Sequence, residues 1–195
     1  MLKGEFKPQK LNLLLVFQVN CPGCFFYALP LFNHLFQRYE KQLGFVALST
    51  AFEDYNYNTN ANTELLIQKG ELVGETKKAL KEQGVDKLPF PLLTPIGMDK
   101  KLDNQEKEEL IEMICKSIAE KNVSANYDRN LLRKNVSDYL NKQEHVSLTF
   151  TANQFKGTPT IALFKEDNQL LNSWFGHVPV ENLIQAIDQF IDVNY

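Results

Sequence analysis

The chain has 195 residues, of which 44% are hydrophobic and 23% are charged, and its formal net charge at pH 7 is -3. This composition is typical of a globular protein that is long enough to bury a core without disulfide bonds. The slightly acidic balance argues against a broad basic surface for nucleic acid or anionic membranes, and the three cysteines are too few for a disulfide-stabilised secreted scaffold.

The first predicted element is a buried β-strand over residues 11–19, where apolar residues form a short, nearly continuous run. Lysines precede this run, so it imitates the start of a secretory signal peptide. The strand is favoured because Asn12 and Gln18 interrupt the run and no small-residue cleavage site follows it. No apolar segment approaches the ~20 residues that span a bilayer. We therefore expect a cytoplasmic protein, or a periplasmic one if a signal peptide was removed before this numbering begins.

The second predicted element is a helix over residues 22–42, which starts inside the Cys-Pro-Gly-Cys sequence at positions 21–24. Its aromatic and aliphatic side chains recur at spacings of three and four and form one apolar stripe. Pro30 lies inside this helix and is expected to kink it. Gly44 ends the helix, and a second short buried strand is predicted over residues 45–49.

The middle of the chain is predicted to be largely helical, after a polar and aromatic loop at residues 51–61. The segments expected after this loop are a helix over 62–83, an extended segment over 88–93, and helices over 104–121 and 127–143. Gly70 and Gly74 weaken the continuity of the first of these helices.

The last part of the chain predicts a β-hairpin and a terminal helix. Residues 145–150 are expected to form a short strand or an extended approach. Strands are then predicted over 161–165 and 170–175, with a polar turn between them, and an amphipathic helix over 180–193. The order of strand, helix, strand, helical region, hairpin and helix indicates a mixed sheet with helices on its faces.

The pair of cysteines is the chemical centre of the sequence. At a strand-to-helix junction, unpaired backbone N–H groups and the helix dipole stabilise a thiolate, which is the reactive form of cysteine. Cys21, at the helix tip, is expected to be the nucleophile, and Cys24, one turn in, the resolving thiol. Half of a zinc site is the alternative, but it needs a second pair of ligands. Cys115 and the three histidines show no paired spacing, so no metal is expected.

This arrangement resembles the thioredoxin superfamily, and its TlpA/ResA-type thiol–disulfide oxidoreductases in particular. The resemblance rests on the motif at 21–24 between strand and helix, on the Gly-Thr-Pro-Thr segment at 157–160 ahead of the hairpin, and on the terminal helix. It implies an α/β, thioredoxin-like fold with a central mixed sheet flanked by helices. It also implies a single domain over 1–195, with a largely helical insertion at about 52–154.

The resemblance further implies the site and its chemistry. Cys21 and Cys24 would exchange disulfides with protein substrates, with a reductase or an oxidase as redox partner and with no cofactor. Pro159 would form a cis peptide bond that faces the cysteines, and Thr158 would offer its backbone to the substrate. The protein is expected neither to span a membrane nor to bind nucleic acid.

The sequence also departs from the family. Asn20 stands where such proteins usually have tryptophan, and Leu15 stands where thioredoxin has a buried aspartate. A proton acceptor for Cys24 would therefore have to come from elsewhere, and Glu53 or Asp54, just after the second strand, is the candidate.

Three other residues have simple interpretations. Cys115 is expected to be a small apolar residue on the buried face of its helix. His34 is expected to be solvated. His177, which the resemblance places in a loop beside the active site, is interpreted as a surface residue.

Two alternative functions remain open from the sequence. A peroxiredoxin-like peroxidase would have threonine three residues before the reactive cysteine, and this chain has Gln18 there. A redox-sensing binding module would use residues 51–154 to dock a partner and would show no turnover.

Overall fold

The computed structural model describes residues 1–121 and 128–194. The chain divides into two compact units, each with its own apolar core. Unit 1 comprises Met1–Met98 and Phe155–Tyr195, and unit 2 comprises Asp99–Gln154. Unit 2 is shorter than the expected insertion at 52–154, since residues 52–98 belong to unit 1. That the whole chain forms a single domain stays a prediction.

Unit 1 is built on a five-stranded mixed sheet with the strand order β3-β2-β1-β4-β5. β1 pairs in parallel with β2, and β2 with β3, whereas β4 pairs antiparallel with both β1 and β5. The strands are β1 (Leu11–Phe17), β2 (Gly44–Ser49), β3 (Ile96–Met98), β4 (Thr160–Lys165) and β5 (Leu170–Phe175). Every residue of the central strand β1 is buried, which explains its nearly continuous apolar sequence. The predicted mixed sheet is confirmed, and the run at 11–17 is a strand.

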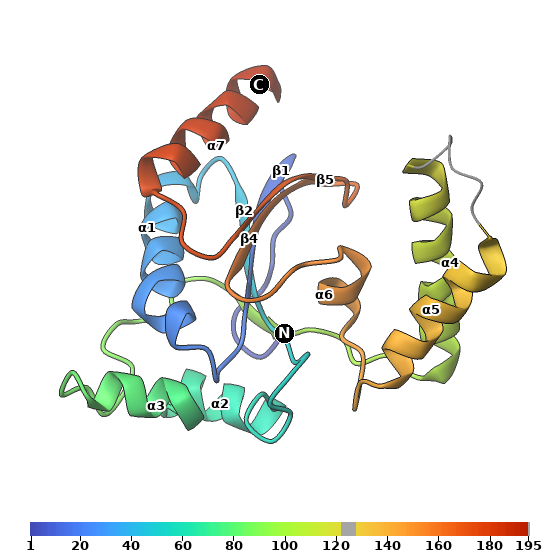
Figure 1. Cartoon of the computed structure of the whole chain (residues 1–195). Helices are drawn as coiled ribbons and strands as arrows, with labels where there is room; N and C mark the ends of the chain where they lie inside the picture. Colours follow the sequence, from blue (N-terminus) through green and yellow to red (C-terminus); the bar gives the residue numbers. More distant parts are fainter. Residues whose placement is uncertain (122–127, 195) are drawn as a thin grey trace. The chain divides into compact units, whose positions relative to one another are not determined.

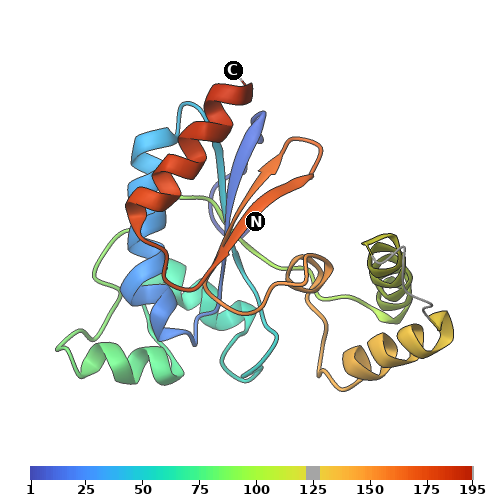
Figure 2. The same cartoon turned by 45° about the horizontal axis from the view of Figure 1, so that its top comes forward.

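The helical segments of unit 1 lie on one face and at one end of this sheet (Figures 1 and 2). They are the π-helical segment η1 (Cys24–Ala28), α1 (Leu29–Tyr39), α2 (Asn60–Lys69), α3 (Gly74–Lys81) and α7 (Val180–Asn194). α1 and α7 lie on the same face of the sheet (Figures 1 and 2), where the Tyr39 hydroxyl donates to Asp188 Oδ1 at 2.6 Å. α2 and α3 lie beyond the end of the sheet at which β1 leads into η1 (Figure 1). The Cys-Pro-Gly-Cys sequence is at this same end.

The helix after β1 differs from the prediction. The helix predicted over 22–42 is confirmed over residues 22–39, but its turn at Cys24–Ala28 is π-helical and precedes Pro30, where the kink was expected. Pro30 is the second residue of α1 and follows η1 directly. The widened turn of η1 therefore begins at Cys24, the second cysteine of the motif.

The expected helix over 62–83 is two helices. Gly70 ends α2 in the left-handed conformation, with φ +67°, which glycine adopts without steric cost. Thr59 caps the start of α2 by accepting from the Asn62 N–H at 3.1 Å, so this helix begins at Asn60, ahead of the predicted start at 62. α3 then begins at Gly74, after Val73 in an extended conformation.

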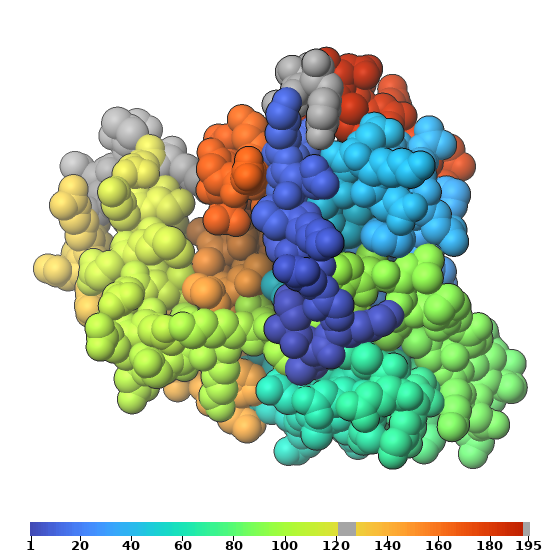
Figure 3. Space-filling view, turned by 180° about the vertical axis from the view of Figure 1, so that it is seen from behind, coloured from blue at the N-terminus to red at the C-terminus, as the bar shows by residue number. Residues whose placement is uncertain are grey.

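β3 was not predicted, and the N-terminal segment covers its outer edge. The Ile96 N–H donates to the Lys3 carbonyl at 2.9 Å, and the Lys3 N–H donates to the Ile96 carbonyl at 3.0 Å. The Lys3 ammonium also donates to the Leu92 carbonyl. Figure 3 shows this dark-blue segment lying along the surface beside the green segment that precedes β3. The backbone of the short strand is therefore paired on both sides.

Unit 2 is helical, as expected. Its helices are α4 (Asn104–Lys121), α5 (Arg129–Asn141) and α6 (Leu148–Ala152). Its core residues are Leu102, Leu110, Ile111, Ile114, Leu140 and Val146. α5 begins after the cap Asp128, whose carboxylate accepts from the Asn130 N–H at 2.9 Å, and the expected first residue, Tyr127, lies outside the described residues. The prediction of a strand or extended approach over 145–150 is wrong for its second half, because α6 begins at Leu148.

Candidate redox site

The two cysteines of the motif form a disulfide at the start of η1. Their Cα atoms are 5.4 Å apart. Cys21 is half-buried in the turn after β1, whereas Cys24 is fully buried, with 0% of its surface exposed. The Cys24 N–H donates to the Cys21 carbonyl at 2.9 Å and lies 3.3 Å from Cys21 Sγ. A reagent from solvent therefore reaches Cys21 first, and a backbone donor is in place to stabilise negative charge on that sulfur.

The segment before β4 lies against these cysteines. The Thr158–Pro159 peptide bond is cis. The Thr158 carbonyl oxygen lies 3.6 Å from Cys21 Sγ, although 137 positions separate the two residues in sequence. Pro159 is buried, and its carbonyl accepts from the Gly176 N–H at 2.9 Å. The four residues predicted for the site, Cys21, Cys24, Thr158 and Pro159, thus come together in unit 1, while their roles remain predictions.

Two amide side chains beside the cysteines were not predicted as part of the site. Gln18 accepts from the Thr158 hydroxyl at 3.1 Å, and Asn20 donates to Asp54 Oδ2 at 2.8 Å. The sequence held a signal for both. They are amides within three residues of Cys21, at the end of a strand that is otherwise almost entirely apolar.

The predicted proton acceptors take other roles. Asp54 accepts from Asn20, and the Glu53 side chain is exposed while its backbone carbonyl accepts from Gln18 Nε2 at 3.3 Å. Within the described residues, the donors and acceptors at Cys21 Sγ are backbone groups of Cys24 and Thr158. A carboxylate acceptor for the Cys24 proton therefore gains no support from these contacts.

The loop after β5 is held against η1 by Tyr27. The Tyr27 hydroxyl accepts from the Val178 N–H at 2.6 Å and donates to the carbonyl of the same residue. Burial raises the pKa of Tyr27, while the bond with Val178 lowers it. The ring of His177 stacks on that of Tyr27, with 4.0 Å between ring centroids, and the histidine is exposed, as is His34. Both histidines therefore match their interpretation as surface residues.

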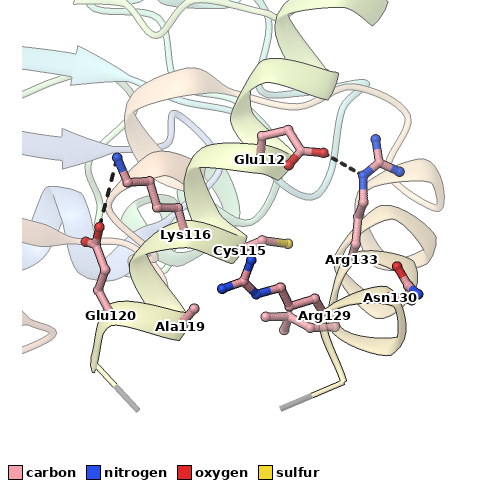
Figure 4. A pocket seen from close by; sticks show the side chains of 9 residues that line it. Glu112, Cys115, Lys116, Ala119, Glu120, Arg129, Asn130 and Arg133 are labelled. Carbon is pink, nitrogen blue, oxygen red and sulfur yellow. Dashed lines mark hydrogen bonds and ion pairs between the residues drawn. The ribbon is translucent and has the colours of Figure 1, made fainter. Parts of the chain in front are cut away.

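Cys115 lies apart in the chain's other unit, in a pocket of about 580 Å³ between α4 and α5. Figure 4 shows its sulfur directed from α4 toward α5. The side chain is half-buried and packs against the core of unit 2, in agreement with the interpretation as a small apolar residue. Burial is the main cause that raises the pKa of Cys115, and Glu112 adds to it while Arg133 opposes it. This thiol is held in its less reactive, protonated form.

Neither a metal nor a membrane is indicated by these elements. Among residues 1–121 and 128–194, no three His, Cys, Asp or Glu side chains gather as metal ligands. None of the described helices is both long and apolar enough to cross a membrane.

Two solved structures share the fold of this chain. One is a thioredoxin-like superfamily protein, with a TM-score of 0.53 and 18% identity, over 93% of this chain and 80% of the other. The second is a thiol–disulfide isomerase from Corynebacterium glutamicum, with a TM-score of 0.55 and 17% identity, over 94% of this chain and 82% of the other. No family model matches the sequence, and no curated protein matches it.

These likenesses define the class. The chain has the thioredoxin-like fold, as the resemblance of its motifs predicted, with a helical unit between β3 and β4. Within that class it carries a disulfide between the two cysteines of a Cys-Pro-Gly-Cys sequence at the start of its first helical segment. The TlpA/ResA subtype remains a prediction.

Proposed function

We propose that this protein is a thiol–disulfide oxidoreductase that exchanges disulfides with protein substrates through Cys21 and Cys24. The observation that carries the proposal is the asymmetry of the disulfide. Cys21 is half-buried with its sulfur beside the Thr158 carbonyl, whereas Cys24 is fully buried. This is the arrangement that a nucleophile and its resolving partner require.

The reaction follows from this geometry. In the reduced protein, the Cys21 thiolate attacks a substrate disulfide, so that a Cys21–substrate bond forms and the first substrate sulfur leaves as a thiolate. The Cys24 thiolate then attacks the Cys21 sulfur, and the second substrate sulfur is released. Two electrons pass from the dithiol to the substrate, and the protein ends with the intramolecular disulfide. The reverse sequence oxidises a substrate dithiol.

The surroundings of Cys21 support this chemistry. The Cys24 N–H, 3.3 Å from Cys21 Sγ, favours the thiolate. Pro159 has no backbone N–H and lies next to the motif, where a Cβ on Gly23 would be 3.9 Å from its Cδ. We assign the backbone of the half-buried Thr158 to the substrate chain that presents its sulfur to Cys21.

The engagement of Gln18 favours disulfide exchange over peroxidase chemistry. Gln18 occupies the position where the peroxidase alternative needs a threonine hydroxyl, and its amide is hydrogen-bonded to Thr158 and to Glu53. Slow oxidation of Cys21 by hydrogen peroxide in stopped-flow measurements, at the rate of a free thiol, is the result we expect.

The proposal is tested by insulin reduction with dithiothreitol as the electron donor. We expect Cys21→Ser to abolish the activity, and Cys24→Ser to accumulate a mixed disulfide on Cys21 that mass spectrometry detects. Cys115→Ser is the matched control, because that thiol lies outside the motif and in the other unit. Full turnover by Cys21→Ser would reject the assignment.

Direction and compartment follow from further measurements. The Cys21–Cys24 reduction potential, determined against glutathione, separates a reductase from an oxidase, because the same residues serve both. A cytoplasmic location remains a prediction, and fractionation of cells that produce the protein tests it.

A further inference from the structure

Gln18 links the Thr158 side of the site to the loop that follows β2. Gln18 is 1% exposed at the end of β1. Its Oε1 accepts from the Thr158 hydroxyl at 3.1 Å, and its Nε2 donates to the Glu53 carbonyl at 3.3 Å. Both ends of the amide are therefore bonded, so its orientation is fixed.

Asn20 links the Cys21 side of the site to the same loop. The Asn20 N–H donates to Asn58 Oδ1 at 3.0 Å, and its side-chain nitrogen donates to Asp54 Oδ2 at 2.8 Å. Its side-chain oxygen accepts from the Glu75 N–H, in the first turn of α3, at 2.6 Å. Asn20 immediately precedes Cys21, so these three bonds fix the backbone that carries the sulfur.

The loop after β2 has an internal hydrogen bond at the residues that Gln18 and Asn20 contact. We call residues 53–58 the anchor loop. Asn58 is 2% exposed, and its side-chain nitrogen donates to the Glu53 carbonyl at 2.9 Å. The same carbonyl thus accepts from Gln18 and from Asn58. The anchor loop joins the two halves of the redox site, although the sulfur contacts come from Cys24 and Thr158.

We propose that Gln18 and Asn20 are positioning residues that set the reactivity of Cys21, because their hydrogen bonds connect both halves of the redox site to the anchor loop. Gln18 holds the Thr158 carbonyl against Cys21 Sγ, and Asn20 holds Cys21 against the Cys24 N–H. This inference rests on the proposed function and deepens it. It also gives a physical role to the asparagine that stands where the family has tryptophan.

The two residues act on the thiolate in opposite directions. A carbonyl oxygen near sulfur stabilises the thiol, which can donate to it, and disfavours the thiolate. A backbone N–H stabilises the thiolate. Loosening Thr158 should therefore raise the thiolate fraction of Cys21, whereas loosening Asn20 should lower it. A general loss of structural order would not change the thiolate fraction of Cys21 in opposite directions for the two residues.

The test measures the ratio of thiolate to thiol at pH 7 from the absorbance at 240 nm of the reduced full-length protein. The variants are Gln18→Met, which keeps the volume and removes both bonds, and Asn20→Ala. Thr158→Val removes the Gln18–Thr158 bond from its other end. Thr63→Val is the matched control, because it removes hydrogen bonds to Ser49 Oγ and to the Thr59 carbonyl, both at 2.9 Å, that involve neither cysteine.

We expect Gln18→Met and Thr158→Val to raise the ratio about threefold and Asn20→Ala to lower it about threefold, the effect of one modest hydrogen bond. Thr63→Val should lower only the urea midpoint. If Gln18→Met and Asn20→Ala shift the ratio in the same direction, or change only the urea midpoint as the control does, the proposal is wrong. If Gln18→Met does not fold, Thr158→Val alone decides its half of the proposal.

The measurement needs no substrate, so it separates the two proposals. A wild-type protein that fails to reduce insulin rejects the proposed function and leaves the positioning test intact. If the wild-type protein reduces insulin, the kinetics of that reaction provide a second measurement. We expect Gln18→Met to raise KM more than it lowers kcat, because Thr158 faces the substrate chain.

Discussion

Replacing Gly74 with alanine tests how tightly Asn20 is enclosed. Gly74 opens α3 with φ +51°, a left-handed conformation that disfavours every residue with a Cβ. A Cβ built at this position would lie 2.7 Å from Asn20 Cγ and would overlap the carboxamide oxygen. That oxygen accepts from the Glu75 N–H, so the alanine would displace it from its partner.

The expected cost is the sum of a backbone part and a contact part. A left-handed alanine costs about 1–2 kcal/mol, and the reduced entropy of the unfolded chain offsets about 0.4–1 kcal/mol of it. Loss of the Asn20–Glu75 bond adds about 0.5–1.5 kcal/mol. Gly84→Ala is the matched control, because Gly84 has φ +76° with nothing within 4 Å of its Cβ position. Gly84→Ala therefore has only the backbone cost of a left-handed alanine, without a lost contact.

Urea unfolding of the two variants isolates the contact. We expect Gly74→Ala to be less stable than Gly84→Ala by about 1 kcal/mol, or by about 2–4 °C in thermal midpoint for a chain of this size. Gly74→Ala should also lower the thiolate fraction of Cys21, as Asn20→Ala does. Equal destabilisation by the two alanines would show that Asn20 is free to move, and the reasoning about its enclosure would fail.

Two predictions concern titration in unit 2. Burial and Glu112 raise the pKa of Cys115, so iodoacetamide should alkylate it more slowly in the native protein than in urea at pH 8, and Glu112→Gln should speed the native reaction; equal native and unfolded rates would contradict this. Burial, with help from Lys101, lowers the pKa of His145 below its usual 6.5. The unfolded chain therefore binds the proton more readily, and the stability that this neutral histidine contributes above pH 6.5 is lost as the pH falls through the folded pKa. Urea midpoints between pH 7.5 and 5 should decline less in His145→Gln than in the wild type, and identical slopes would count against the assignment.

The parts of the fold that the sequence predicts are those with local signals. β1 and β4 are largely apolar runs, and α7 has a clear helical period, so their types follow from burial and spacing alone. Cys21 and Cys24 could be chosen because a cysteine pair at a strand-to-helix junction has a local chemical meaning, whereas Thr158 and Pro159 followed from the resemblance to the thioredoxin superfamily.

The features that escaped prediction depend on distant partners. β3 has only three residues and exists because β2 and Lys3 pair with it on either side. The amides at positions 18 and 20 acquire their meaning from Glu53, Asn58 and Thr158, to which no sequence spacing points. The π-helical turn after Cys24 has no signature in the periodicity, since its apolar residues fit an ordinary helix equally well.

The cover over β3 has a consequence for handling the protein. The outer edge of that strand is protected by the backbone of the first few residues, fastened by the Lys3 ammonium on the Leu92 carbonyl. An uncovered edge strand is a template on which another chain can pair. Proteolytic removal of this stretch would expose Ile96 at the edge of β3 and favour self-association, even though every residue of the redox chemistry lies elsewhere in the chain.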